Sequence, residues 1–118
     1  GWGWPEDWGV WSEGRASELV IPLPNSKPTK LHINSRALIS DNHLTQDVDI
    51  YVDEKFIKTY TLDKGEKNLI DLDIPNNPYK NYIVIRFEFK RGLTSPKLLG
   101  TGNDDRLLGL GLVSITLE

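Results

Sequence analysis

The stretch YIVIRFEFK, residues 82–90, decides the fold class of this chain. Its apolar side chains occupy every second position, namely Ile83, Ile85, Phe87 and Phe89. The polar side chains between them include Arg86, Glu88 and Lys90. Alternation with a period of two puts one set of side chains in a core and the other in water. The stretch therefore predicts a β-strand with one buried face.

Similar alternating runs cover most of the remaining chain. We expect further strands in residues 18–23, 30–39, 46–53, 56–62, 70–74 and 110–117. Turn-rich segments with proline, glycine and asparagine separate them at intervals of about 8–12 residues. No segment longer than a turn shows the period of a helix. The pattern predicts an all-β protein, an antiparallel jelly-roll-like β-sandwich of about eight strands.

Length and composition limit the organisation and the partners. A length of 118 residues with 38% hydrophobic content predicts a single β-sandwich domain over residues 1–118, and the absence of methionine suggests a domain excised from a longer protein. The 14 basic and 17 acidic residues are interspersed and sum to a charge of −3, which argues against nucleic acid as a partner. No apolar run approaches the ~20 residues that span a bilayer, so we expect no membrane insertion by this segment.

All four tryptophans lie within GWGWPEDWGVWS, residues 1–12. Full burial of one indole removes roughly 150–250 Å² from water, worth about 4–6 kcal/mol at ~25 cal/mol per Å². Either the rings close one end of the core, or some stay exposed because their faces stack on sugar rings. Trp8 and Trp11 fit the core role. Trp2 and Trp4 have glycine neighbours and precede Pro5, so we expect them on a peripheral arm. There they either contact a ligand or belong to a fraying terminus.

Motifs at both ends of the chain carry a resemblance to a known family. They are Pro5-Glu6-x-Trp8-Gly9-x-Trp11-Ser12 at the start, and Ser95-Pro96, Leu99-Gly100 and Asp104-Asp105-Arg106-x-Leu108-Gly109 near the end. They resemble a poorly characterised family of small bacterial β-sandwich domains. Members of that family resemble carbohydrate-binding jelly rolls and are appended to envelope enzymes, notably membrane glycosyltransferases and phosphoglycerol transferases. The resemblance implies an accessory, extracytoplasmic role, and it provides no catalytic residues.

The candidate sugar-binding residues combine aromatic faces with polar groups that bind hydroxyls. They are Trp2, Trp4, Tyr51, Tyr60, Asp47, Asp49 and Arg86, expected to line a shallow groove on one sheet. The candidate structural residues are Glu6, Trp8, Trp11 and Arg106. We expect Glu6 to pair with Arg15 or Arg106 and so to pin the N-terminal loop. The loop at residues 103–106 would then meet the tryptophan loop at one end of the sandwich.

The acidic pairs do not indicate catalysis. Asp47 with Asp49, and Asp71 with Asp73, place two carboxylates side by side on one face of a strand. Glycoside hydrolysis needs two carboxylates that face each other across a bond, one of them desolvated. We therefore interpret both pairs as the wet side of half-buried strands, and we expect no enzyme activity.

Metal and cofactor sites are also not indicated. Asn103, Asp104 and Asp105 offer oxygen ligands for calcium, but turn capping is the better interpretation. His32 and His43 lack a neighbouring ligand or nucleophile and are expected to be solvated, and cysteine is absent. We expect no metal and no cofactor.

Two classes of function remain. The preferred one is a non-catalytic module that binds oligosaccharide or polysaccharide as part of a cell-envelope protein of glycan biosynthesis or modification. The alternative is a structural or docking domain that packs against the rest of its parent protein, or a protein partner, without binding sugar. Aromatic side chains are enriched in protein interfaces, so the tryptophans fit this alternative too.

Overall fold

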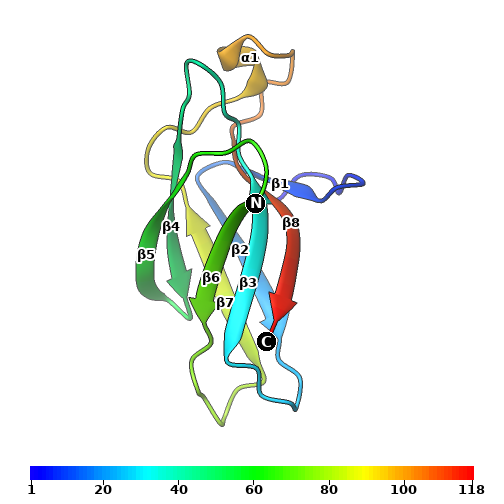
Figure 1. The fold of residues 1–118 in the computed structure, drawn as a ribbon, viewed down its shortest axis with the longest axis vertical. Coiled ribbons are helices and arrows are strands. Elements are labelled where there is room, and N and C mark those ends of the chain that lie inside the picture. The colour runs from blue at the N-terminus through cyan, green and yellow to red at the C-terminus, as the bar shows by residue number, and fades with distance from the viewer.

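The computed structural model describes all 118 residues and contains eight strands and one single-turn helix (Figure 1). The strands are β1 (Val10–Glu13), β2 (Ala16–Pro22), β3 (Lys30–Arg36), β4 (Gln46–Val52), β5 (Lys55–Leu62), β6 (Asn68–Asp73), β7 (Tyr82–Glu88) and β8 (Leu108–Leu117). The helix α1 (Pro96–Leu99) lies between β7 and β8. The structure has no helix with the length and hydrophobicity that a membrane span requires.

The strands form two antiparallel four-stranded sheets packed face to face. Their orders are β1-β8-β3-β6 and β2-β7-β4-β5. Every connection except the β4–β5 hairpin passes from one sheet to the other. This arrangement of eight strands is that of a jelly roll. The predicted antiparallel β-sandwich of about eight strands is confirmed.

The strand predicted at residues 82–90 lies inside its sheet as β7, between β2 and β4. Its side chains Ile83, Ile85 and Phe87 point between the sheets and are buried. They pack in one cluster with side chains from the facing sheet, including Leu31 and Ile33 of β3. Burial of this alternating apolar set is the main stabilising contribution to the sandwich.

The β4–β5 hairpin turns at Asp53 and Glu54. Both residues have positive φ, 48° and 70°. Two such residues form the two-residue turn whose twist matches that of the flanking strands. A bulge between Ile50 and Tyr51 interrupts the register of the same hairpin.

The structure differs from the sequence expectation at several strand ends. β1 was not expected, because a stretch of four residues is too short to show a recognisable period and because its tryptophan points away from the core. The strand expected over 30–39 ends at Arg36, the strand expected over 82–90 ends at Glu88, and the last strand begins earlier, at Leu108. α1 is a helix of a single turn, which side-chain periodicity does not reveal.

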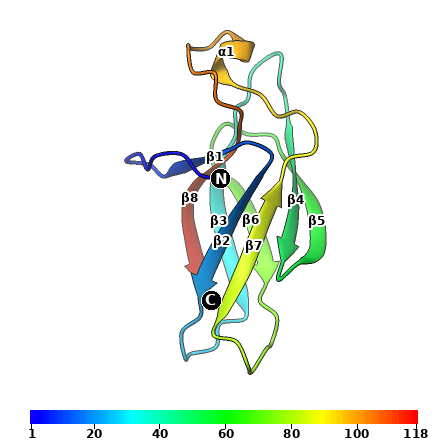
Figure 2. The ribbon, with the colours of Figure 1, turned by 180° about the vertical axis from the view of Figure 1, so that it is seen from behind.

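The N-terminal arm, residues 1–9, starts against the sandwich and then projects from its side at β1 in both views (Figures 1 and 2). It lies on the side away from β4 and β5. α1 and its flanking loops cover one end of the sandwich, and the β2–β3 and β6–β7 loops lie at the other. The arm, the two outer sheet faces and the loop ends are therefore the places where a site could form.

Candidate functional site

The root of the N-terminal arm is fixed by Trp2. Its indole packs edge-on against Phe87, with ring centroids 6.0 Å apart. Its Nε1 donates a hydrogen bond to the Glu18 carbonyl at 2.8 Å. Trp2 therefore lies partly buried at the edge of the core. The prediction that it sits on a free peripheral arm is wrong, because the indole finds both apolar surface and an acceptor.

The rest of the arm folds back along β1. The Gly3 amide donates to the Trp11 carbonyl at 2.9 Å, and Glu6 and Gly9 exchange two backbone hydrogen bonds of 2.7 and 3.1 Å. Gly9 has a φ of 151°, and a Cβ there would lie 2.0 Å from the carbonyl oxygen of Leu112. Only glycine allows the arm to approach β8 so closely.

Trp8 and Trp11 pack on the outer side of the β1-β8-β3-β6 sheet. Trp11 and Arg36 both pair with Gly111, so the three residues share the outward face. The Trp8 ring covers Gly111, where a Cβ would lie 2.8 Å from its Cη2. It meets Trp11 edge-on at 5.3 Å, and the Arg36 guanidinium stacks on it at 4.3 Å. The prediction that these rings close the core is wrong, because the buried Ser12 takes the inward position in β1.

Trp4 differs from the other three tryptophans in exposure. It is 88% exposed, whereas Trp2, Trp8 and Trp11 are each partly buried. The segment that carries it is nevertheless held at both ends, at Trp2 and at Gly9. The arm thus presents one indole to solvent from an ordered backbone.

The outer side of β3 and its neighbours forms a polar surface next to Trp8, which we call the β3 face. Its members are His32, Asn34 and Arg36 of β3, Gly111, Ser114 and Thr116 of β8, and Leu69 and Asp71 of β6. A hollow of about 230 Å³ lies on it, lined by residues that include Asn34, Leu69 and Ser114. The Asn34 side-chain oxygen is shielded from solvent and accepts no hydrogen bond. The sequence predicted that the side chains of residues 30–39 alternate between two faces of a strand. It did not show which strands would flank this one, so the β3 face was not predicted.

The outer side of the other sheet, which we call the β4–β7 face, carries Asp47, Asp49, Tyr51 and Arg86, as their alternation predicts. Asp49 accepts a hydrogen bond of 2.5 Å from the Thr59 hydroxyl and forms an ion pair of 3.2 Å with Lys90. The Thr59 bond, followed by Lys90, holds the pKa of the Asp49 carboxyl below its usual range.

The remaining predicted residues of the β4–β7 face are also engaged within the protein. Arg86 binds Glu88 at 2.7 Å and Glu18 at 3.2 Å. Asp47 accepts from the Thr61 hydroxyl at 2.8 Å and pairs with Arg91 at 3.2 Å. The Tyr51 ring packs against Phe56 with centroids 5.4 Å apart, and its hydroxyl accepts from Lys90 at 3.3 Å. These groups satisfy one another, so less of their hydrogen-bonding capacity is free for a ligand.

Tyr60 does not lie on the β4–β7 face. It pairs with Val48, a core residue, and so points between the sheets. Its hydroxyl donates to the Asp71 carbonyl at 3.0 Å, and burial raises the pKa of Tyr60. The predicted residues therefore do not form one groove: Trp4 is on the arm, Trp2 and Tyr60 pack inward, and the other four share the β4–β7 face.

Arg106 joins the loop before β8 to β1, so the two ends of the chain meet as predicted. The partners of Arg106 differ from the expected Glu6. Arg106 binds both carboxylate oxygens of Asp104, at 2.6 to 3.0 Å, and Glu13 at 3.2 Å. The guanidinium holds the pKa of Asp104 below its usual range. The expected pair between Glu6 and Arg15 or Arg106 does not form; Glu6 is exposed on the arm and its backbone pairs with Gly9. Asp104 is thus used by a side chain of its own loop, which weakens the calcium interpretation.

The two histidines have specific partners, contrary to the expectation that they are simply solvated. His32 Nδ1 lies 2.5 Å from Asp71, and Nε2 lies 3.1 Å from Glu118. These contacts raise the pKa of His32, the Asp71 bond most of all. His43 contacts the Leu38 carbonyl at 2.5 Å and the Gly92 carbonyl at 2.6 Å. Asp71, Glu118 and Gly92 lie far from these histidines in the sequence, whereas Leu38 is only five residues before His43.

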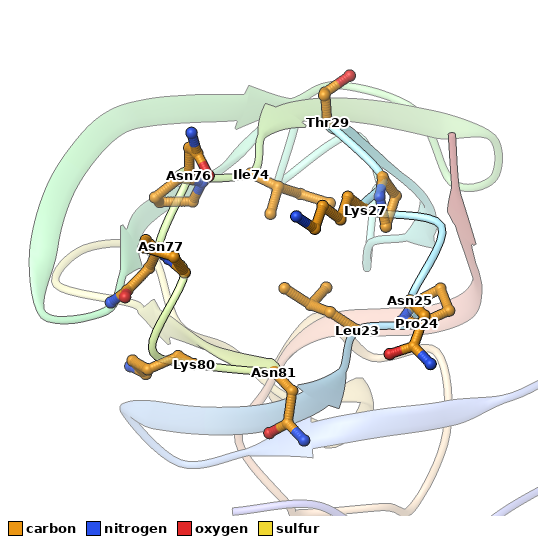
Figure 3. A pocket seen from close by; sticks show the side chains of 13 residues that line it. Leu23, Pro24, Asn25, Lys27, Thr29, Ile74, Asn76, Asn77, Lys80 and Asn81 are labelled. Carbon is orange, nitrogen blue, oxygen red and sulfur yellow. The ribbon is translucent and has the colours of Figure 1, made fainter.

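A cavity of about 650 Å³ lies at the end of the sandwich opposite α1, between the β2–β3 and β6–β7 loops (Figure 3). Leu23 and Ile74 point toward one another across its floor. Its rim carries asparagines, prolines and two lysines, of which Lys80 is paired with Asp53 at 3.2 Å. None of the predicted site residues lines this cavity, and its rim offers no carboxylate, histidine or hydroxyl nucleophile beyond Thr29.

Two solved structures contain a region of similar fold. The secreted serine protease VesC from Vibrio cholerae matches with a TM-score of 0.54 and 20% identity, over 96% of this chain and 22% of that one. The salicylyl-acyltransferase SsfX3 from a tetracycline biosynthetic pathway matches with a TM-score of 0.49 and 13% identity, over 87% of this chain and 23% of that one. The chain thus spans less than a quarter of either protein. At these identities the likeness shows the fold alone.

Comparison with curated protein sequences gives no significant match. One family model, described as a domain of unknown function (DUF7024), matches residues 1–118. The chain therefore belongs to the DUF7024 family.

Proposed function

We propose that the chain is a non-catalytic glycan-binding module, appended to a larger protein that makes or modifies polysaccharide of the bacterial cell envelope. Its ligand is an oligosaccharide or polysaccharide, and its place is outside the cytoplasm, where such polymers lie. The resemblance of its two end motifs to envelope-enzyme domains supports this context. The jelly-roll fold and the small share of larger chains that it matches fit an appended module.

The observation that carries the proposal is the exposure of Trp4 on an ordered arm. An indole that is 88% exposed leaves a large apolar face in water, which costs free energy that burial would recover. The backbone on either side is held by Trp2 and by the close approach of Gly9 to β8. A fixed, exposed aromatic face suits stacking on the apolar face of a sugar ring, since little conformational entropy is lost on binding.

The proposal is tested by retention of the domain on a panel of immobilised envelope oligosaccharides. We expect the unmodified domain to be retained by one class of glycan and Trp4→Ala to lose at least tenfold in affinity. Tyr79→Ala is the matched control, because Tyr79 is 94% exposed but lies in the β6–β7 loop. Both variants should keep the melting temperature of the unmodified domain.

Two outcomes would speak against the proposal. If no glycan retains the unmodified domain, the docking role is favoured, with Trp4 as a contact to the parent protein. If Tyr79→Ala weakens retention as much as Trp4→Ala does, the arm is not the site.

A further inference from the structure

We propose that a neutral, linear oligosaccharide lies along the β3 face, packed against Leu69 and hydrogen-bonded by Asn34, Ser114 and Thr116. This inference rests on the proposed function and deepens it, because it names the ligand class and the surface. It also moves the polar part of the site from the β4–β7 face to the opposite sheet.

The dimensions of the β3 face suit a short oligosaccharide. From Arg36, beside Trp8, to His32 the strand advances four residues, about 13 Å at ~3.3 Å per residue. The face is three strands wide, about 10 Å between β8 and β6 at ~4.8 Å per strand. The hollow of about 230 Å³ lies in its middle, over Asn34. A single sugar ring would leave most of this length empty.

Three polar side chains of the β3 face, those of Asn34, Ser114 and Thr116, form no hydrogen bond within the protein, unlike those of the β4–β7 face. The Asn34 oxygen is shielded and has no partner inside the protein, but the side chain lines the hollow, and rotation of its carboxamide presents the oxygen or the NH₂ group to a sugar hydroxyl. Ser114 and Thr116 are exposed on the neighbouring strand and line the same hollow. A sugar hydroxyl is both donor and acceptor, so it matches such groups, and an unpaired shielded acceptor destabilises the free domain until it is bonded.

The charges around the β3 face select a neutral ligand. Three basic side chains border it, and each is paired with a carboxylate: Lys30 with Asp73, His32 with Asp71 and Glu118, and Arg36 with Glu66. No unpaired cation is left on the face for a uronate or phosphate group, and the carboxylates repel one. Leu69, which is 72% exposed, supplies an apolar patch for the CH face of a sugar ring.

The test is isothermal titration of three hexasaccharides: a β-1,4-glucan, its N-acetylglucosamine counterpart and a galacturonate. We expect one neutral hexasaccharide to bind at least tenfold more tightly than the galacturonate. Asn34→Ala and Thr116→Ala should each weaken that binding at least fivefold. Thr116 is exposed on β8, so its variant keeps the test valid even if Asn34→Ala folds poorly. Tyr51→Ala, on the β4–β7 face, is the control and should bind as the unmodified domain does.

Different results separate this inference from the proposed function. If Asn34→Ala and Thr116→Ala bind normally and Tyr51→Ala does not, the domain binds glycan but on the β4–β7 face, and the inference fails alone. Tighter binding of the galacturonate overturns the ligand class. If the glycan panel and all three hexasaccharides fail to bind, the proposed function fails as well.

Discussion

At the scale of single residues, each tryptophan has the role that its neighbours allow. Trp2 is held because an apolar ring and a backbone acceptor, Phe87 and the Glu18 carbonyl, lie within reach. Trp8 is held because Gly111 leaves space beneath it and Arg36 covers it. Trp4 has no comparable neighbour and stays in water. The tryptophans, which are clustered in the sequence, therefore have different roles in the structure: Trp2 anchors the arm, Trp8 covers the sheet and Trp4 is exposed to solvent.

The division between anchor and platform predicts opposite effects on stability. Trp2→Ala should lower the free energy of unfolding by about 3 kcal/mol, because it removes a partly buried ring and leaves the Glu18 carbonyl without its donor. Trp4→Ala should change it by less than about 0.5 kcal/mol. Urea denaturation followed by far-UV circular dichroism measures both. A large loss for Trp4→Ala would show that the arm packs in a way that the structure does not have.

At the scale of elements, β3 is joined to β6 by a ladder of exposed ion pairs. Lys30 pairs with Asp73 and His32 with Asp71, and Glu118 at the end of β8 reaches His32 as well. Such exposed pairs contribute little individually. They fix how the side chains of the β3 face lie, and they make that face sensitive to pH.

The stability of this ladder should depend on the charge of His32. Because the pKa of folded His32 is raised above its ordinary value, its contribution is fully present below that ordinary value and is lost as the pH rises through the folded pKa. The melting temperature of the unmodified domain should exceed that of His32→Gln at pH 5, and the difference should shrink toward pH 8. A difference that grows with pH would contradict the assigned pairing.

The loop before β8 should depend on Arg106 for its attachment to β1. Arg106→Met removes the contacts to Asp104 and Glu13 and should lower the free energy of unfolding by about 1 kcal/mol, since the pairs are only half-buried. Arg15→Met is the matched control, because Arg15 is exposed and forms no ion pair. Urea denaturation at low and at 1 M salt measures the effect, and the two variants should converge at high salt. Equal stability at low salt would mean that the contacts do not attach the loop.

At the scale of the whole molecule, alternation in the sequence was enough to predict a sandwich but not its surfaces. The apolar side chains of β7, such as Phe87, had to be buried, because the polar side chains that alternate with them could not be. Tyr60 could have been placed inward, since it shares its parity with the buried Leu62. Trp11 could not have been placed outward, because that depends on Gly111, a hundred residues later in the chain. The β3 face was equally hidden, because no local pattern states which strands become neighbours.

The most direct test of glycan binding is a two-dimensional amide NMR titration of the domain with the glycan that the panel selects, or with every panel member at its solubility limit if none is selected. The four indole NH groups report separately on the arm. We predict that the Trp4 indole signal and the signals of backbone amides in β3 and β8 move. The Trp2 indole signal, whose NH is bonded to the Glu18 carbonyl, should stay in place. An unchanged spectrum with every glycan would contradict the account and leave the docking role as the better explanation of the exposed tryptophan.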